Sequence, residues 1–251
     1  FVAEGEAKEV LLLDPPIERS VADALKEMAA AQNGLNITIK ELAQMMAGRS
    51  KAAVLPVVKI KTHADNQEPF PYIEGSAVLK DGKLIAGMSD ADTRGIMWLR
   101  NEIKRATVSV SPDESPGTVS AQLLKSRTQL IPHIRGDRWS ITVRIEALDE
   151  IIENTTNLDL SVPKHIEHVE KALENDINRR LSSVLERAQK EMKADIFQFA
   201  DVFYRKYPRE WNRNAKRWDE IFPIVDVEIA TKVKIARPGL LGKNIFKKEQ
   251  R

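Results

Sequence analysis

The sequence predicts an α+β protein of several modules, with antiparallel sheets that are each covered by helices. Two pairs of runs in which apolar and polar residues alternate carry this prediction, because a period of two is typical of strands with one buried face. Asp81-Gly82 joins the first pair, at 72–88, and residues 135–137 join the second pair as a long antiparallel hairpin. One long helix then follows, because apolar residues return every three or four positions: Ile166, Val169, Leu173, Ile177, Leu181, Leu185, Ala188 and Met192.

Length and composition allow two or three modules and exclude several kinds of chemistry. The chain has 251 residues, 42% of them hydrophobic, which is enough for more than one core. It has no cysteine, which excludes disulfides, thiolate metal sites and cysteine nucleophiles. The net charge of +2 is too balanced to indicate a nucleic-acid-binding field over the whole surface. No stretch approaches the roughly 20 apolar residues of a membrane helix.

Residues 1–69 form the first predicted module. The chain begins within a predicted strand, without an initiator Met or a signal sequence, so we interpret it as a fragment of a longer protein. Helical patterns follow, and Thr38 and Glu41 have the spacing of a capping box at the start of the last of them. A strand is predicted at 53–63, where Pro56 restricts it to a sheet edge or an initial position.

Residues 70–112 form the second predicted module, which contains the Asp-Gly hairpin, a helix and a strand. Ser89 is the predicted N-cap of the helix, and Asp90 and Asp92 lie in its first turn, where the positive end of the helix favours acidic residues. The strand is predicted at 106–111. The sequence SPDESPG then marks a boundary, because its prolines and small polar residues are typical of a turn or linker.

Residues 117–251 form the third predicted module, in the order strand, strand, helix, helix, strand. Ser161 is the predicted cap of the long helix, and Pro163 lies near its first turn, where a missing amide proton costs nothing. A second helix is predicted over the aromatic stretch, with an interruption near Pro208. A strand of period two closes the module at 224–236, so helices are expected on one face of an antiparallel sheet.

Aromatic residues gather in one region of this module. Spacings of four and seven place the rings in two rows along a helix face, which is typical of core packing. The alternative is stacking on single-stranded nucleic acid, because basic residues such as Arg205, Lys206, Arg209 and Arg213 are interleaved with the rings. The periodicity favours the core. The clustered rings are Phe197, Phe199, Phe203, Tyr204, Tyr207, Trp211, Trp218 and Phe222.

One acidic pattern resembles a calcium loop but lacks its key ligands. Asp90 and Asp92 are followed by Gly95, as in a loop that binds a hard cation. Position five is Arg94, and position twelve is Asn101 where such loops have a bidentate Glu. A capped helix start explains the acidic residues better, so no metal is expected there.

Two further patterns have simple structural explanations. Ser161 and Lys164 have the Ser-x-x-Lys spacing of an activated nucleophile, but the companion motifs of such enzymes are absent and a helix cap is favoured. His165 and His168 lie three apart on the long helix, where a solvated pair is favoured over a metal site. No phosphate-binding loop or nucleophile elbow is present. The prediction is therefore a non-enzymatic protein without a cofactor or metal.

The carboxyl-terminal end is basic, with seven Lys and Arg residues after Thr231 against one acidic residue, Glu249. Such a tail suits phosphates, anionic lipid or an acidic partner, although a solvated terminus is favoured. A nucleic-acid-binding module that uses this tail and the basic aromatic helix is the alternative hypothesis for function. A small-molecule hydrolase ranks third, and would require a pocket that holds a nucleophile and an oriented base.

Several segments together resemble one protein family. They are YIEGSAVLKDGKLIAGMSDADTRGIMWL, NLDLSVPK, KADIFQFADVFYRKYPREWN, RWDEIFP and VEIATKVKIARPGL, in this order. They are similar to the spore germination Ger(x)C family, the C subunit lipoproteins of nutrient germinant receptors. The resemblance covers the chain from about Tyr72 onward. Residues 1–69 resemble, more loosely, the latter part of the N-terminal domain of that family.

The resemblance implies that the protein functions in germination. It also implies that the source is a spore-forming bacterium. C subunits of this family lie at the outer, extracytoplasmic surface of the spore inner membrane together with polytopic A and B subunits. Their lipid-modified cysteine is near the start of the precursor, so the resemblance implies an anchor upstream of Phe1. The family has no catalytic motif or cofactor to carry over, and nucleic acid is not an expected partner. We therefore expect signalling through protein–protein contacts.

One helix supplies the candidate contact residues. Thr93, Arg94, Gly95 and Trp98 are expected at an interdomain or partner contact. Trp98 lies four positions after Arg94 on roughly the same helix face, and a large amphipathic ring suits an interface. Burial of Trp98 in a core is the competing interpretation, and general burial tendencies favour it.

Overall fold

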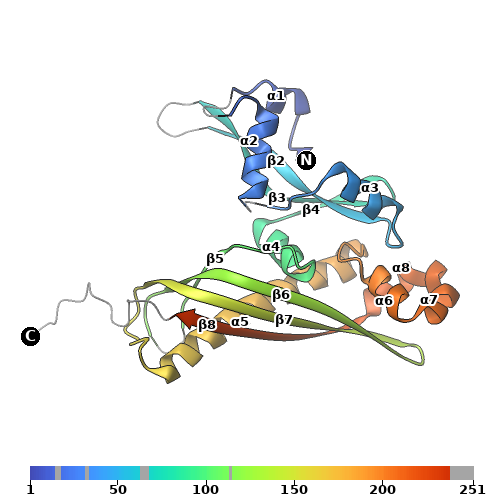
Figure 1. Ribbon diagram of the computed structural model, residues 1–251. Coiled ribbons are helices and arrows are strands. Elements are labelled where there is room, and N and C mark those ends of the chain that lie inside the picture. Colours follow the sequence, from blue (N-terminus) through green and yellow to red (C-terminus); the bar gives the residue numbers. More distant parts are fainter. Residues whose placement is uncertain (15–17, 32–33, 63–67, 113–114, 238–251) are drawn as a thin grey trace, which may run out of the picture.

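The computed structural model describes residues 1–14, 18–31, 34–62, 68–112 and 115–237. Two four-stranded sheets form in this part of the chain, with strand orders β1-β2-β3-β4 and β5-β6-β7-β8. Figure 1 shows the first sheet above the second, with helix α4 between them. The predicted α+β class with more than one sheet module is confirmed.

The first sheet belongs to the N-terminal lobe, which we define as residues 1–88. The predicted hairpin turns at Asp81 and Gly82, whose φ angles of 49° and 78° suit the type I′ turn that Asp-Gly favours in hairpins. A capping box between Thr38 and Glu41 starts α3, as predicted. The elements of this lobe are β1 (Val2–Ala3), α1 (Ala7–Leu11), α2 (Val21–Ala30), α3 (Ile39–Ala47), β2 (Ala52–Thr62), β3 (Pro69–Lys80) and β4 (Lys83–Met88).

The second sheet belongs to the C-terminal lobe, residues 107–237, and α4 (Asp90–Leu99) links the two lobes. The long hairpin and the long helix are confirmed, and the helix continues as one π-helical segment, η1. The aromatic stretch forms two helices that divide at Pro208, also as predicted. The elements are β5 (Thr107–Val110), β6 (Val119–Arg135), β7 (Arg138–Asn154), α5 (Pro163–Glu186), η1 (Arg187–Met192), α6 (Phe199–Lys206), α7 (Pro208–Asn214), η2 (Ala215–Arg217), α8 (Trp218–Ile221), η3 (Phe222–Ile224) and β8 (Asp226–Arg237).

The strand directions correct the expectation of purely antiparallel sheets. β8 pairs with β7 in parallel, from Ser140 opposite Asp226 to Leu148 opposite Lys234. The pairing is parallel because α5 carries the chain back along the sheet, so that β8 starts where β7 starts. β1 also pairs with β2 in parallel. Alternation along a strand shows which residues face a core, but it does not show which way a neighbouring strand runs.

The strand pairing groups the residues differently from the predicted module boundaries. β2 pairs with β3 along its length, across the boundary expected between 1–69 and 70–112. β5, expected in the module at 70–112, pairs with β6 in the second sheet. The boundary expected after residue 69 falls at the start of β3, which pairs with β2. The division at 1–69, 70–112 and 117–251 stays a prediction.

Two local predictions differ from the structure in detail. Ser161 does not cap α5: its hydroxyl and its backbone N–H both donate to Asp159, and Val162 occupies the cap position. Pro163 does lie in the first turn. Pro56 is in the middle of β2, where the pairing with β3 shifts register next to it, so a bulge accommodates the proline instead of a strand end.

The aromatic cluster is core, as the periodicity predicted. Six of its rings are buried, and Tyr204 and Tyr207 pack half-buried against the same cluster. Trp139 of β7 joins them, with its ring 4.7 Å from Phe203 and 6.0 Å from Trp218. The rings therefore fasten α6, α7 and α8 to the second sheet. The buried rings of the cluster are Phe197, Phe199, Phe203, Trp211, Trp218 and Phe222.

Candidate partner-contact site around helix α4

Helix α4 starts at a capping box that is built from two predicted residues. The Ser89 side chain accepts a hydrogen bond from the backbone N–H of Asp92 at 3.2 Å, and Asp92 in turn accepts from the Ser89 hydroxyl at 2.7 Å. Asp90 lies outside this pair and accepts from the backbone N–H of Gly75 in β3 at 2.5 Å. The two acidic residues of the calcium-like pattern thus hold a helix start against the first sheet.

Asp92 also joins α4 to the end of the long helix. Its carboxylate forms an ion pair with Arg187, and a second guanidinium nitrogen of Arg187 donates to the carbonyl of Gly87 at 3.2 Å. Burial opposes the ionisation of Asp92, but the hydrogen bonds from Ser89 and the Arg187 guanidinium outweigh it, so the pKa of Asp92 lies below its usual value. Asp92 is therefore ionised at neutral pH and holds the two lobes together.

Thr93 and Gly95 are both buried, Thr93 where α4 contacts β3 and Gly95 where α4 contacts α5. The Thr93 hydroxyl donates to the carbonyl of Ser89 at 2.8 Å, so the Ser76 hydroxyl of β3, 2.9 Å away, is the donor in their mutual hydrogen bond. Gly95 packs on α5, where an added Cβ would lie 2.8 Å from Val184 and 3.0 Å from the carbonyl oxygen of Arg180. These two residues lie between the lobes.

Arg94 and Trp98 have different surroundings, although they share a helix face. Trp98 is only 3% exposed and belongs to the main hydrophobic core, so its ring is not on the surface. Arg94 is exposed, and within the described part of the chain it forms no hydrogen bond or ion pair. Of the four predicted contact residues, Arg94 is the one whose side chain is free to meet another molecule.

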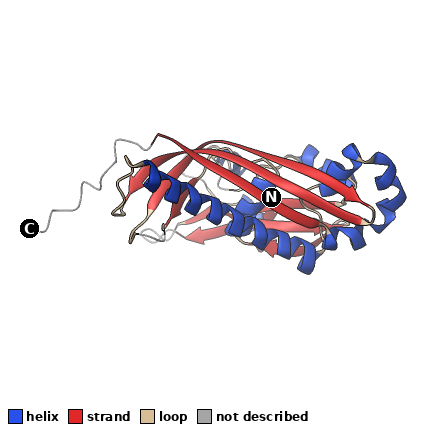
Figure 2. Cartoon of the chain, turned by 90° about the horizontal axis from the view of Figure 1, so that it is seen from below, coloured by secondary structure: helices blue, strands red, loops and turns tan. Residues whose placement is uncertain are grey.

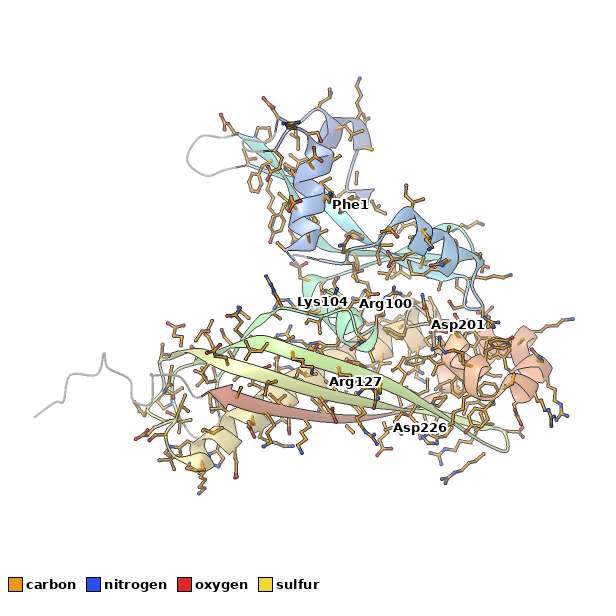
Figure 3. All side chains as sticks on the ribbon, viewed as in Figure 1. Phe1, Arg100, Lys104, Arg127, Asp201 and Asp226 are labelled. Carbon is orange, nitrogen blue, oxygen red and sulfur yellow. The ribbon has the colours of Figure 1, made fainter. Side chains whose placement is uncertain are left out.

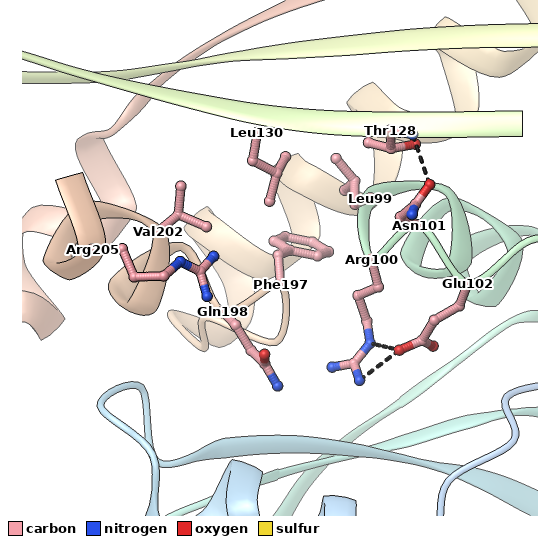
Figure 4. Close-up of a pocket in the computed structure, with 10 residues that line it drawn as sticks. All are labelled: Leu99, Arg100, Asn101, Glu102, Thr128, Leu130, Phe197, Gln198, Val202 and Arg205. Carbon is pink, nitrogen blue, oxygen red and sulfur yellow. Dashed lines mark hydrogen bonds and ion pairs between the residues drawn. The ribbon is translucent and has the colours of Figure 1, made fainter.

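A small cleft lies beside the carboxyl end of α4 and faces the N-terminal lobe (Figure 4). Its volume is about 250 Å³. Arg100 donates to Glu102 at 2.7 Å, and Asn101 accepts from the backbone N–H of Thr128 in β6 at 2.7 Å. Burial raises the pKa of Glu102 even though the Arg100 guanidinium opposes the shift. The cleft has the remaining lining residues Leu99, Leu130, Phe197, Gln198, Val202 and Arg205.

Cationic side chains connect the lobes beside α4, and no sequence pattern indicated these contacts. Arg49 pairs with Asp201 of α6 at 2.6 Å and stacks on the Tyr204 ring, 3.5 Å from its centre. Lys80 donates at 2.7 Å both to Asp219 and to the carbonyl of Lys193. The partners are more than a hundred positions apart, so no local pattern could have shown these contacts.

The other candidate residues take structural roles in the described part of the chain. His165 has its Nδ1 atom 2.8 Å from the carbonyl oxygen of Asp159. No group of three or more His, Asp and Glu side chains that could hold a metal ion is present among the described residues. Within the same residues, no helix is both long enough and apolar enough to cross a membrane. Much of the basic tail, residues 238–251, lies outside the described residues.

The fold defines an α+β protein in which a mostly buried helix, α4, joins two sheets. Comparison with known proteins identifies its family. The family model described as "Spore germination B3/ GerAC like, C-terminal" matches residues 74–239, and the chain belongs to this spore germination family. This agrees with the resemblance recognised in the sequence.

Individual relatives show how much of a whole protein the chain represents. Spore germination protein KC of Bacillus subtilis (strain 168) is 26% identical over 253 residues, which cover 94% of this chain and 62% of that protein. Spore germination protein YndF of the same organism is 29% identical over 167 residues, or 66% of this chain and 41% of that protein. The chain thus spans between two fifths and two thirds of these relatives.

A solved structure shares the fold. The crystal structure of the GerBC protein is similar with a TM-score of 0.69 at 20% identity, and the match covers 93% of this chain and 67% of that chain. At this identity the likeness concerns the fold.

Proposed function

We propose that this chain is part of the C subunit of a nutrient germinant receptor. In this proposal it has no enzymatic activity and acts in germination through contacts with the A and B membrane subunits. The subunit lies at the extracytoplasmic face of the spore inner membrane, with a lipid anchor upstream of the chain. Membership of a spore germination family supports the role in germination.

The single observation that supports the contact role is the arrangement around α4. Three of the four predicted residues are buried and tie α4 into the protein, whereas Arg94 extends from the same helix into solvent. The capping box and the contacts with both lobes fix the backbone of α4, so the point from which Arg94 extends is defined. Six of the eight clustered aromatic rings, by contrast, are buried, so these six are not available to stack on nucleic-acid bases.

The test is Arg94→Ala in spores, with Arg209→Ala as the matched control. Arg209 is also exposed on a helix, α7, and forms no ion pair with the described residues. We expect Arg94→Ala to lower the levels of the A and B subunits and to slow nutrient germination, while the isolated chain keeps its melting temperature. Normal subunit levels and normal germination in Arg94→Ala spores would reject the contact role. Equal defects in both variants would also reject it.

A further inference from the structure

One face of the second sheet has no helix on it. Helices α4, α5 and α6 all contact the strands from one side, and α5 touches both edge strands, β5 and β8, so the sheet curls around it. Figures 1 and 2 show the long helix on one side of the strands, with no described element on the other. We call this second side the outer face. Inward residues Val143, Ile145 and Ala147 are buried, whereas Arg144 and Glu146 between them are exposed.

The strand register places basic residues in neighbouring rows on the outer face. Arg127 and Lys232 flank Glu146 in one row. The next row holds Lys125, Leu148 and Lys234, and the row on the other side holds Gln129, Arg144 and Ala230. Five cations therefore face a single carboxylate across these rows. We define the basic patch as Lys125, Arg127, Arg144, Lys232 and Lys234.

Most of this positive charge is not neutralised by the protein itself. Lys234 forms an ion pair with Glu170 of α5 at 2.7 Å. The other four cations of the basic patch form no ion pair with any described residue. The same face is more balanced toward the hairpin turn, where Glu228 and Asp226 lie in the rows of Thr142 and Ser140, and Arg138 of the last row pairs with Asp226 at 2.6 Å. The basic patch is therefore a local feature of one end of the outer face.

Two β-bulges add exposed aliphatic side chains to this end of the sheet. The pairing of β6 with β7 skips Leu124 on one strand and Ile152 on the other. Leu124 is 45% exposed and Ile152 43% exposed, whereas the preceding residues Leu123 and Ile151 are each only 4% exposed. A bulge can redirect a side chain. Here both extra residues are large and apolar, and both turn away from the core.

The shape of the surface favours a broad partner over a peptide strand. A shallow hollow of about 400 Å³ lies over the basic patch, between Lys125, Arg127, Lys232 and Lys234. The β8 edge is closed, because the N–H groups of Val233 and Ile235 donate to glutamates of α5 at 3.3 Å and 3.0 Å. A peptide therefore cannot add as a strand there.

We propose that the basic patch, together with Leu124 and Ile152, binds the surface of an anionic lipid bilayer. Lys and Arg side chains near a membrane are attracted to anionic headgroups, and exposed aliphatic side chains enter the boundary between headgroups and acyl chains. The cations are spread over three strands of a curved face, so each can meet a different lipid phosphate. This inference concerns the chain alone and does not depend on membership of a receptor complex.

The test is sedimentation of the full chain with vesicles. One set contains phosphatidylcholine with 30% phosphatidylglycerol, which is our choice of anionic content, and the other contains phosphatidylcholine alone. We expect binding to the anionic vesicles only, weakened by salt. Each neutralised cation should reduce the partition constant about fivefold, so Lys125→Gln, Arg127→Gln and Lys232→Gln combined should reduce it about a hundredfold.

Two further variants show whether the effect belongs to the basic patch. Arg135→Gln removes an exposed cation from the same strand beyond the basic patch, and should bind like the original chain. Leu124→Ser with Ile152→Ser keeps all charges and should still weaken binding to anionic vesicles. Every variant keeps all the Lys and Arg residues of 238–251, so any difference between the variants arises from the sheet. Unchanged melting temperatures confirm that each variant is folded.

Several outcomes would overturn the proposal. Absence of binding to anionic vesicles would do so, as would equal binding by the triple variant. Salt-sensitive binding to polyglutamate without binding to vesicles would assign the basic patch to an acidic protein instead. Equal losses for Arg135→Gln and the single patch variants would show a general charge effect.

Discussion

Two contacts of this protein are built from opposite kinds of side chain. The inner face of the second sheet holds α5 and the aromatic helices through buried apolar groups, with Phe203 and Trp218 packed on Trp139. The N-terminal lobe meets the same helices through half-exposed charged groups, such as Arg49 and Lys80, beside the mostly buried α4. Figure 3 shows Arg100 and Asp201 in the region between the lobes.

The difference separates what gives the protein its stability from what positions its parts. Buried apolar contacts each contribute several kcal/mol. Exposed or half-exposed ion pairs contribute about 0 to 1 kcal/mol and respond to salt. We therefore expect damage to the aromatic core to unfold the C-terminal lobe, and damage to the flanking ion pairs to loosen the lobes while leaving each folded.

The largest expected effect is at the centre of the aromatic core. Phe203→Ala should lower the free energy of unfolding by about 3 to 5 kcal/mol, because the side chain is fully buried and the variant leaves a cavity. Denaturant unfolding measures this loss. Phe1→Ala is the matched control, since Phe1 is 52% exposed and its truncation should cost less than about 0.5 kcal/mol. Similar small losses for both would mean that the rings are not the core.

Asp149 is a charged exception among the buried apolar groups on the inner face of the second sheet, and removing its charge should stabilise the protein. Burial raises the pKa of Asp149 to about 6, and within the described residues its Oδ1 atom has no hydrogen-bond partner. The folded state then holds the proton more tightly than the unfolded state, so stability falls as pH rises from about 4 to about 6. Asp149→Asn should gain up to about 3 kcal/mol above pH 6, and the gain should disappear toward pH 4.

Asp195 provides the contrasting control for Asp149. Burial raises its pKa to about 6 as well, but its carboxylate accepts from the backbone N–H groups of Phe199 and Ala200 and from the Trp218 indole. Asp195→Asn places an amide N–H₂ group in a site built from donors, so it should destabilise at pH 7. Denaturant unfolding between pH 4 and pH 8 measures both variants. Destabilisation by Asp149→Asn at pH 7 would contradict the buried charge.

A substitution at Gly95, where α4 packs on α5, tests the apolar centre of the contact between the lobes. Gly95→Ala should cost about 1 to 3 kcal/mol, because the added Cβ overlaps Val184 and the Arg180 carbonyl. Gly87→Ala is the control, since a Cβ there has no atom within 4 Å among the neighbours that the structure describes. Thermal unfolding compares the two. Equal melting temperatures would mean that the helices do not cross this closely.

The smallest expected effect is on the flank of the lobe contact. Arg49→Ala removes the ion pair with Asp201 and the contact with the Tyr204 ring, and should cost at most about 1 kcal/mol. The loss should shrink in 1 M salt, where the charges are screened. Arg138→Ala breaks an exposed pair with Asp226 on the other sheet face and should be nearly neutral. A loss of several kcal/mol for Arg49→Ala would place this flank among the stabilising contacts.

Sequence patterns predicted the elements that depend on local chemistry. The turn at Asp81-Gly82, the Thr38 and Ser89 caps and the buried stripe of α5 follow from neighbours a few positions apart. The parallel direction of β8, the pairing of β2 with β3 and the ion pairs of Arg49 and Lys80 depend on contacts between distant positions. No alternation or capping signal contains that information, so these features came from the structure.

The candidate site shows the same division. The capping box and the acidic first turn of α4 could be predicted, and so could its place on an amphipathic helix. Which residues face the other lobe could not, because Trp98 and Arg94 have the same spacing whether the ring is buried or exposed. The structure separates them, with Trp98 in the core and Arg94 in solvent.

The most direct test of this contrast is hydrogen exchange on a variant with Arg49→Gln and Lys80→Gln combined. We predict faster backbone exchange in α3 and β4, which adjoin Arg49 and Lys80 along the chain, and unchanged protection in α6 and α8, which the buried rings hold on the second sheet. Loss of protection in α6 and α8 would contradict the account, because it would mean that the aromatic helices depend on the N-terminal lobe for their stability.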